Sequence, residues 1–219
     1  MILVISDNIE INSYFKKSAS RIDERFSYFT SSNINVVEDQ EEIVNKYDIV
    51  FSAHCKQIFP KSLVDRVRCI NIHPGYNPYN RGWYPHVFSI INKLPAGATI
   101  HEMDEKLDHG SIICQEEVEI DSWDTGESLY RKVINAERSL IEKWLKNIID
   151  HEYVATSPTS KGNLNTKLDF ENLCRIDSNS TVKVSDFVDL LRATSYSEFD
   201  NAFLDDELYV KILLNRKNS

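Results

Sequence analysis

Long apolar runs are absent from this sequence. No stretch approaches the ~18 consecutive apolar residues that a membrane-spanning helix requires. The chain opens on the apolar segment 1–6, with neither the basic segment nor the long hydrophobic region of a secretory leader. These absences predict a soluble, cytoplasmic protein with no membrane partner.

Several motifs that mark common site chemistries are also missing. The four cysteines, Cys55, Cys69, Cys114 and Cys174, lie far apart, and no CxxC or HxxxH pair supplies two adjacent metal ligands. No Gly-x-Ser-x-Gly elbow marks a serine hydrolase. Ser6-Asp7-Asn8 follows the first apolar segment, where a dinucleotide-binding protein carries GxGxxG. We therefore expect reduced thiols, no metal and no Rossmann-type cofactor.

Positive charge is in the minority, since 25 Lys and Arg residues oppose 34 Asp and Glu, for a formal net charge of −9. Most nucleic-acid affinity comes from cations that neutralise phosphates, so this balance disfavours a nucleic-acid partner. The 219 residues, 42% of them hydrophobic, suffice for one sizeable core and a small appendage.

Strand-like and helix-like segments alternate through the first part of the chain. Hydrophobic periodicity predicts strands at 2–6, 26–30, 34–37, 48–53 and 69–73, and helices at 9–20, 41–46 and 61–67. This alternation favours an α/β fold with a doubly wound, mostly parallel sheet. Active sites in such folds lie at the carboxyl ends of the strands.

The remaining segments predict how the chain is completed. A helix at 83–92, paired strands at 98–103 and 112–120, and a long helix from near Asp124 to about Asp150 follow in order. Asp124 and Glu127 are the expected N-cap and N3 partner of that helix. Its predicted core stripe is Leu129, Val133, Ala136, Leu140, Trp144 and Ile148.

The composition then shifts, which predicts two parts. Residues 1–150 form the expected catalytic domain, and residues 151–219 form a linker and a small C-terminal α+β extension. Within the extension we expect a helix at 185–193 and a strand at 208–214.

The candidate catalytic residues are Asn71, His73 and Asp108. Asn71 and His73 are two apart at the end of an apolar run, so on a strand they project from the same face before Pro74 and Gly75 end it. Asp108 follows in the connection between the two paired strands. A neutral imidazole accepts the proton of an attacking amine, a carboxylate orients it, and a carboxamide donates to an oxyanion.

The surroundings of these residues match a known family. The stretch from Asn71 to Gly82, together with 97–103 (Gly-Ala-Thr-Ile-His-Glu-Met) and 107–112 (Leu-Asp-His-Gly-Ser-Ile), resembles the folate-dependent formyltransferases. Residues 74–85 are most similar to the sugar N-formyltransferases that act on dTDP-4-amino-4,6-dideoxyglucose. Glycinamide ribonucleotide formyltransferase has a glycine-rich phosphate loop where this chain has Ser6-Asp7-Asn8. The tail is too short for the barrel domain of methionyl-tRNA formyltransferase.

The resemblance implies two ligands. The co-substrate is N10-formyltetrahydrofolate, which the family holds mainly through backbone groups of two loops. Here the matching residues are Lys56, Gln57, Ile58, Phe59, Met103, Asp104 and Lys106. The acceptor is a nucleotide-linked amino sugar, with substrate contacts expected from Tyr76, Asn77, Arg81, Gly82, Trp83 and Tyr84. Among these, Arg81 offers a fork for diphosphate oxygens, and the aromatic rings offer stacking surfaces.

The implied activity is formyl transfer from the folate to the amine of a dTDP-linked amino sugar, for surface polysaccharide such as lipopolysaccharide O-antigen. Two alternatives stay open: another formyl-folate enzyme, either with a different acceptor or a hydrolase, and a catalytically silent nucleotide-sugar binding protein. The resemblance also implies a homodimer. The expected interface is the segment 112–120 or the segment 208–214.

Overall fold

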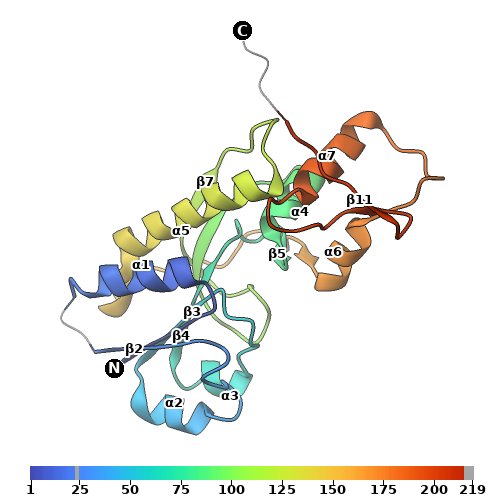
Figure 1. Ribbon diagram of the computed structural model, residues 1–219. Helices are drawn as coiled ribbons and strands as arrows, with labels where there is room; N and C mark the ends of the chain where they lie inside the picture. Colours follow the sequence, from blue (N-terminus) through green and yellow to red (C-terminus); the bar gives the residue numbers. More distant parts are fainter. Residues whose placement is uncertain (23–24, 215–219) are drawn as a thin grey trace.

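A six-stranded mixed sheet forms the centre of the molecule (Figure 1). The structure is a computed structural model, and it describes residues 1–22 and 25–214. The strand order is β2-β1-β3-β4-β6-β7. Strands β2, β1, β3 and β4 pair in parallel, β6 runs antiparallel to β4, and β7 runs antiparallel to β6. The strands are β1 (Ile2–Ser6), β2 (Phe26–Phe29), β3 (Ile49–Ala53), β4 (Arg68–His73), β6 (Ala96–Glu102) and β7 (Ile112–Val118). The expected mostly parallel α/β sheet is confirmed.

Helices cover both faces of the sheet, which makes it doubly wound. Helices α1 (Ile9–Ala19) and α5 (Gly126–Ile149) lie together on one face, and α2 (Gln40–Lys46) and α3 (Lys61–Val64) lie on the other (Figure 1). Successive residues of β1 point to opposite faces, as a strand requires. Val4 therefore joins the core under α1 and α5, whereas Leu3 and Ile5 join the core under α2 and α3.

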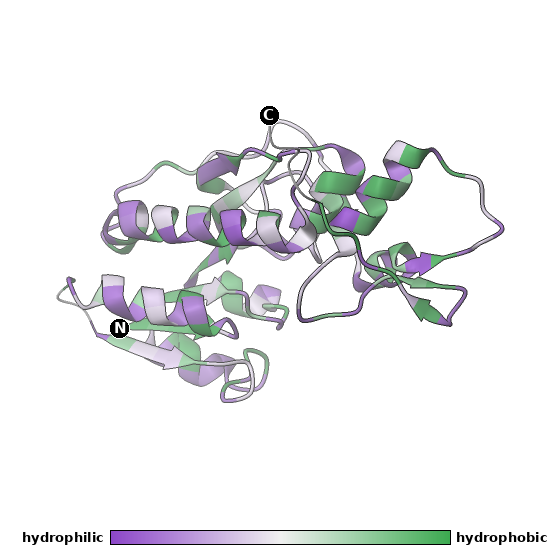
Figure 2. Cartoon of the chain, turned by 45° about the horizontal axis from the view of Figure 1, so that its top comes forward, coloured by the Kyte–Doolittle hydropathy of each residue, from purple (hydrophilic) through white to green (hydrophobic). Residues whose placement is uncertain are grey.

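Helix α5 is amphipathic, and its inner face is the stripe that the sequence predicts. Leu129, Val133, Ala136, Leu140 and Ile148 are buried, and Trp144 packs against the same core while partly exposed. Figure 2 shows the hydrophobic and hydrophilic residues that alternate along the helices. Among the described residues, no helix is long and apolar enough to cross a membrane.

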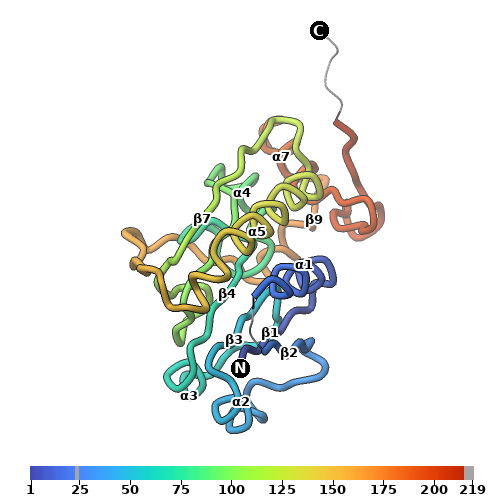
Figure 3. Tube along the Cα trace, turned by 90° about the vertical axis from the view of Figure 1, so that its left-hand side faces the viewer, coloured from blue at the N-terminus to red at the C-terminus, as the bar shows by residue number. Residues whose placement is uncertain are grey.

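The C-terminal extension packs beside α4 (Pro85–Asn92), through contacts of α7 with α4 and α5 (Figure 3). Its elements are β8 (Leu164–Asn165), α6 (Lys167–Leu173), β9 (Arg175–Ile176), α7 (Val184–Thr194), β10 (Phe203–Leu204) and β11 (Leu208–Tyr209). Strand β8 pairs with β5 (Arg81–Gly82). Buried Arg192 of α7 donates to the carbonyls of Asp121 and Asp124, which ties the extension to the start of α5.

The predicted strand at 34–37 is wrong. Side-chain amides bind the backbone there: Gln57 Oε1 accepts the Val36 amide at 2.8 Å, and Asn35 Oδ1 accepts the Val37 amide at 3.0 Å. The apolar pattern reflects the burial of Val36 in the core below the sheet. Burial and strand pairing give the same signal in so short a run.

Three other elements, α3, α4 and β11, are shorter than predicted. Helix α3 ends at Val64 because the chain must enter β4 at Arg68. Helix α4 begins at Pro85, after Tyr84 in a left-handed conformation with φ of 51°. Strand β11 covers only Leu208–Tyr209 of the expected 208–214.

The predicted cap of the long helix is also wrong by one residue. Thr125 is the N-cap of α5 and forms a capping box with Ser128. Asp124 instead accepts the Asp121 amide at 2.7 Å and binds Lys132 at 2.6 Å. Glu127 binds Ser197 of the extension. Asp124 and Glu127 therefore stabilise the start of α5 through contacts other than the N-cap hydrogen bond.

Candidate active site

Asn71 and His73 lie at the carboxyl end of β4, between the parallel strand β3 and the antiparallel strand β6. Strand alternation places both side chains on one face of the sheet. The chain then turns back over the imidazole at Gly75. A Cβ at Gly75 would lie 2.4 Å from His73 Nε2, so only glycine permits this approach.

Asp108 reaches the same place from the loop between β6 and β7. Its backbone is left-handed, with φ of 48°, a conformation that aspartate tolerates better than most residues. Oδ1 accepts the Asn71 amide NH2 at 2.9 Å, and Oδ2 lies 3.5 Å from His73 Nδ1. The structure therefore brings the three candidate catalytic residues together.

Two of the expected substrate residues hold this aspartate in place. The backbone amide of Gly82 donates to Asp108 Oδ2 at 3.0 Å, and the Asn77 side chain donates to the Asp108 carbonyl at 3.0 Å. Asn77 is 2% exposed, and its own amide donates to Thr99 Oγ1. Asn77 and Gly82 therefore have a structural role after β4, because their hydrogen bonds fix the position of Asp108.

Burial sets the protonation of His73. The side chain is 4% exposed, and its Nε2 has no hydrogen-bond partner. Loss of solvation lowers the pKa of His73 to about 4, against the opposing field of Asp108. Burial alone would raise the pKa of Asp108, but His73, His101 and the Gly82 amide lower it to about 2. A neutral imidazole thus faces a carboxylate at neutral pH.

His101 is a member of this cluster to which the sequence reasoning gave no role. It lies on β6 directly opposite Asn71 and is 1% exposed. Its Nε2 is 3.2 Å from Asn71 Nδ2 and 3.8 Å from Asp108 Oδ1. The signal was the side-by-side register of β4 and β6, which the sequence does not specify.

A cavity with about 440 Å³ of empty space adjoins Asn71 and Asp108. Both loops that the resemblance assigns to folate line it, with Ile58, Phe59 and Met103 among its walls. The complete lining is Ser52, Gln57, Ile58, Phe59, Asn71, His101, Met103, Asp104, Glu105, Lys106, Leu107 and Asp108. Of the expected cofactor residues, only Lys56 is not part of this lining.

The Gln57 side chain is already bound by the protein. Its Nε2 donates to the carbonyls of Ser31 at 2.9 Å and Ile34 at 2.7 Å, and its Oε1 accepts the Val36 amide. The side chain therefore anchors the loop at 56–59 to the loop at 31–36. A ligand in the cavity would therefore contact the backbone of residues 56–59, whose position the Gln57 side chain fixes.

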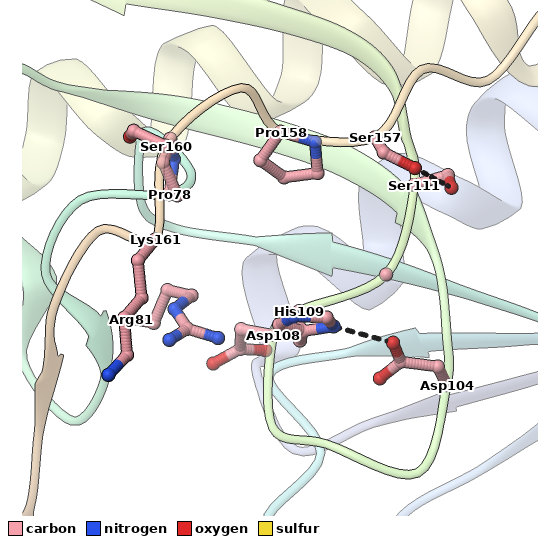
Figure 4. Close-up of a pocket in the computed structure, with 11 residues that line it drawn as sticks. Pro78, Arg81, Asp104, Asp108, His109, Ser111, Ser157, Pro158, Ser160 and Lys161 are labelled. Carbon is pink, nitrogen blue, oxygen red and sulfur yellow. Dashed lines mark hydrogen bonds and ion pairs between the residues drawn. The ribbon is translucent and has the colours of Figure 1, made fainter.

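A second cavity, with about 490 Å³ of empty space, shares Asp104 and Asp108 with the first (Figure 4). Arg81 and Lys161 supply positive charge there, and three serine hydroxyls line it beside them. The Arg81 Nε atom is buried without a partner, while Nη1 donates to the Leu107 carbonyl at 3.3 Å. Lys161 comes from the loop before β8, a segment that the sequence identified only as a linker.

The expected aromatic residues differ in their surroundings. The Tyr84 ring lies 4.0 Å from that of Phe170, centroid to centroid, so Tyr84 packs against the extension. Tyr76 lies against Gly97 of β6. Trp83 is partly exposed, with its ring 5.8 Å from that of Tyr84. Across residues 1–22 and 25–214, no group of three or more histidine, cysteine or acidic side chains is arranged to hold a metal ion.

The sequence matches the formyl transferase family over residues 3–145, and the chain belongs to that family. Residues 169–216 match the dimerization C-terminal domain of N-formyltransferases. These matches confirm the resemblance drawn from the residues around β4 and identify an enzyme of the formyltransferase class.

Individual relatives extend the match beyond residues 3–145. The dTDP-4-amino-4,6-dideoxyglucose formyltransferase of Mycobacterium tuberculosis is 48% identical over 184 residues, which cover 82% of this chain and 79% of the relative. A solved protein structure from the same organism is 41% identical, with a TM-score of 0.95 over 100% of this chain and 99% of that one. A 4-N formyltransferase from Francisella tularensis is 38% identical, with a TM-score of 0.92 over 99% and 98%.

Proposed function

We propose that this enzyme transfers a formyl group from N10-formyltetrahydrofolate to the amine of a dTDP-linked amino sugar, with dTDP-4-amino-4,6-dideoxyglucose as the first candidate. The observation that carries the proposal is the cluster of Asn71, His73 and Asp108 beside the cavity of the two folate-type loops. The 48% identical relative is named for that sugar nucleotide. The match covers most of both chains, which supports a shared acceptor.

The walls of the cavity suit a folate ring. Ile58, Phe59 and Met103 offer apolar surface, and loop backbone groups offer donors and acceptors for the ring edge. When bound, formyl-folate supplies the electrophilic formyl carbon. We assign contacts with it to Gln57, Ile58, Phe59, Met103, Asp104 and Lys106, and a more peripheral position to Lys56.

The proposed chemistry follows from the protonation states. His73, neutral at physiological pH, accepts a proton from the attacking amine. Asp108 orients the imidazole and stabilises it once it is charged. An Asn71 N–H donates to the oxyanion that develops on the formyl oxygen. His73 can return that proton to N10 of the folate as the bond from N10 to the formyl carbon breaks, so tetrahydrofolate leaves and the formyl group stays on the sugar amine.

For the acceptor, we propose that Arg81 and Lys161 contact diphosphate oxygens at the second cavity, since both cations line it. Tyr76, Trp83 and Tyr84 are all partly exposed, and we assign ring stacking on the ligand to Trp83. Tyr76, Tyr84, Asn77 and Gly82 then shape the acceptor side through the contacts described above. Arg81→Ala should raise KM for the sugar nucleotide more than it lowers kcat, because diphosphate contacts are shared by ground and transition states.

One assay separates the candidate functions. The protein is incubated with N10-formyltetrahydrofolate and a panel of dTDP-amino sugars, and the mass of each sugar nucleotide is measured by mass spectrometry. A gain of one formyl group on the 4-amino sugar supports the proposal. Formate release without an acceptor would identify a hydrolase, and sugar binding without turnover would identify a silent binding protein.

We further propose the wider setting of the reaction. Residues 1–150 are the catalytic domain, and 151–219 are a linker and an extension that forms a homodimer, consistent with the dimerization match at 169–216. Leu208 and Tyr209 of β11 are 62% and 68% exposed, so the segment 208–214 fits an interface better than the partly covered β7. The enzyme acts in the cytoplasm on precursors of surface polysaccharide. Sedimentation at micromolar concentration tests the dimer, and a monomer would contradict it.

A further inference from the structure

The tautomer of His101 is fixed by the backbone. Its Nδ1 lies 2.7 Å from the carbonyl oxygen of Glu102, which can only accept a hydrogen bond. Nδ1 must therefore carry the proton, and in the neutral imidazole Nε2 is left as an acceptor. This Nε2 faces the Asn71 side chain at 3.2 Å.

The orientation of the Asn71 amide follows from this tautomer. Its NH2 group donates one hydrogen to His101 Nε2 and the other to Asp108 Oδ1 at 2.9 Å. The flipped amide would place Asn71 Oδ1 against a lone pair and a carboxylate, three acceptors together. His101 and Asp108 therefore turn the NH2 of Asn71 inward, and both of its hydrogens are occupied.

An occupied donor cannot also bind an oxyanion, so one partner must give way. The bond to the Asp108 carboxylate is charge-assisted and short, whereas the bond to His101 Nε2 is longer and weaker. The hydrogen held by His101 is consequently the easier one to transfer to a developing negative charge.

We propose that His101 is a positioning residue for formyl transfer: it holds the Asn71 NH2 toward the reacting carbon and releases one N–H to the oxyanion. This inference rests on the proposed function, because it assigns a role in that reaction. His101 acts through Asn71 and does not touch the reacting atoms itself.

The first test compares two substitutions in the full-length protein. His101→Phe keeps a flat ring and removes the acceptor, and should lower kcat roughly tenfold with little change in KM for formyl-folate, the effect of one lost hydrogen bond in the transition state. His101→Gln restores an acceptor and should stay within about threefold of the wild type. Equal losses in both variants, or a rise in KM alone, would overturn the proposal.

The second test asks whether His101 acts through Asn71. In an Asn71→Ala background, His101→Phe should cost less than about twofold, because the group that it positions is gone. A full tenfold loss in that background indicates a separate packing role and contradicts the inference. Turnover by the wild type, measured in the same assay, keeps this result separate from the question of the reaction itself.

A third measurement does not depend on activity. Protein labelled with 15N-histidine reports by NMR which ring nitrogen of each histidine carries the proton, and His101→Gln assigns the signal. We expect His101 to show the Nδ1–H tautomer, in contrast to the form that is usual in solution. An Nε2–H signal from His101 would rule the proposal out whatever the kinetic measurements show.

Discussion

Gly75→Ala tests whether the position of the His73 imidazole sets the rate. The added methyl would lie 2.4 Å from Nε2 and 2.8 Å from Cδ2 of His73, where ordinary contacts begin at 3.4 Å. The imidazole must therefore move by about 1 Å, and a displacement of that size in a reacting group costs on the order of 100-fold in rate. Overpacking by one methyl should cost only about 1–3 kcal/mol of folding free energy.

The assay measures kcat for formyl transfer, the Kd for formyl-folate by calorimetry, and the thermal midpoint of the same preparation. We expect a large loss of kcat, a nearly unchanged Kd and a folded protein. His73→Asn provides the matched background, in which Gly75→Ala should add little further loss. A variant that retains wild-type kcat would refute the argument that the chain at Gly75 fixes the imidazole.

The candidate catalytic cluster could be predicted because its signals are local. Asn71 and His73 alternate on one short strand, and Pro74-Gly75 marks where it ends. Strand alternation needs no knowledge of the partner strands. The link from Asn71 and His73 to Asp108 came from the family resemblance. In the structure Asp108 contacts Asn71, with a left-handed backbone at Asp108.

The contacts that could not be predicted depend on pairing and on competition. His101 meets Asn71 because β6 runs antiparallel to β4 in one particular register, and a shift by one residue would turn it to the other face. Asp124 is a good N-cap by residue type, yet Lys132 and the Asp121 amide bind it, and Thr125 caps α5 instead. Sequence patterns do not show which of several possible partners a polar group will choose.

Three further predictions follow from contacts at the site. His73→Asn and Asp108→Ala should each lower turnover by about 10²–10⁴-fold with the fold intact, measured as kcat beside circular dichroism; near-normal turnover in either would remove that residue from the mechanism. Gln57→Leu should raise KM for formyl-folate while kcat changes little, because it frees the 56–59 loop; an unchanged KM would show that the loop needs no such anchor. Burial lowers the pKa of His73 to about 4 and of His86 to about 3, so the unfolded state binds protons first as pH falls below 6.5. The stability from each neutral histidine is therefore complete above pH 6.5 and is lost as pH falls toward 4 for His73 and toward 3 for His86, by about 2 kcal/mol per histidine at pH 5. Urea unfolding at pH 7 and pH 5 should show this loss, and His86→Phe should reduce it by one histidine's share; an identical pH dependence in that variant would mean that His86 is not buried neutral.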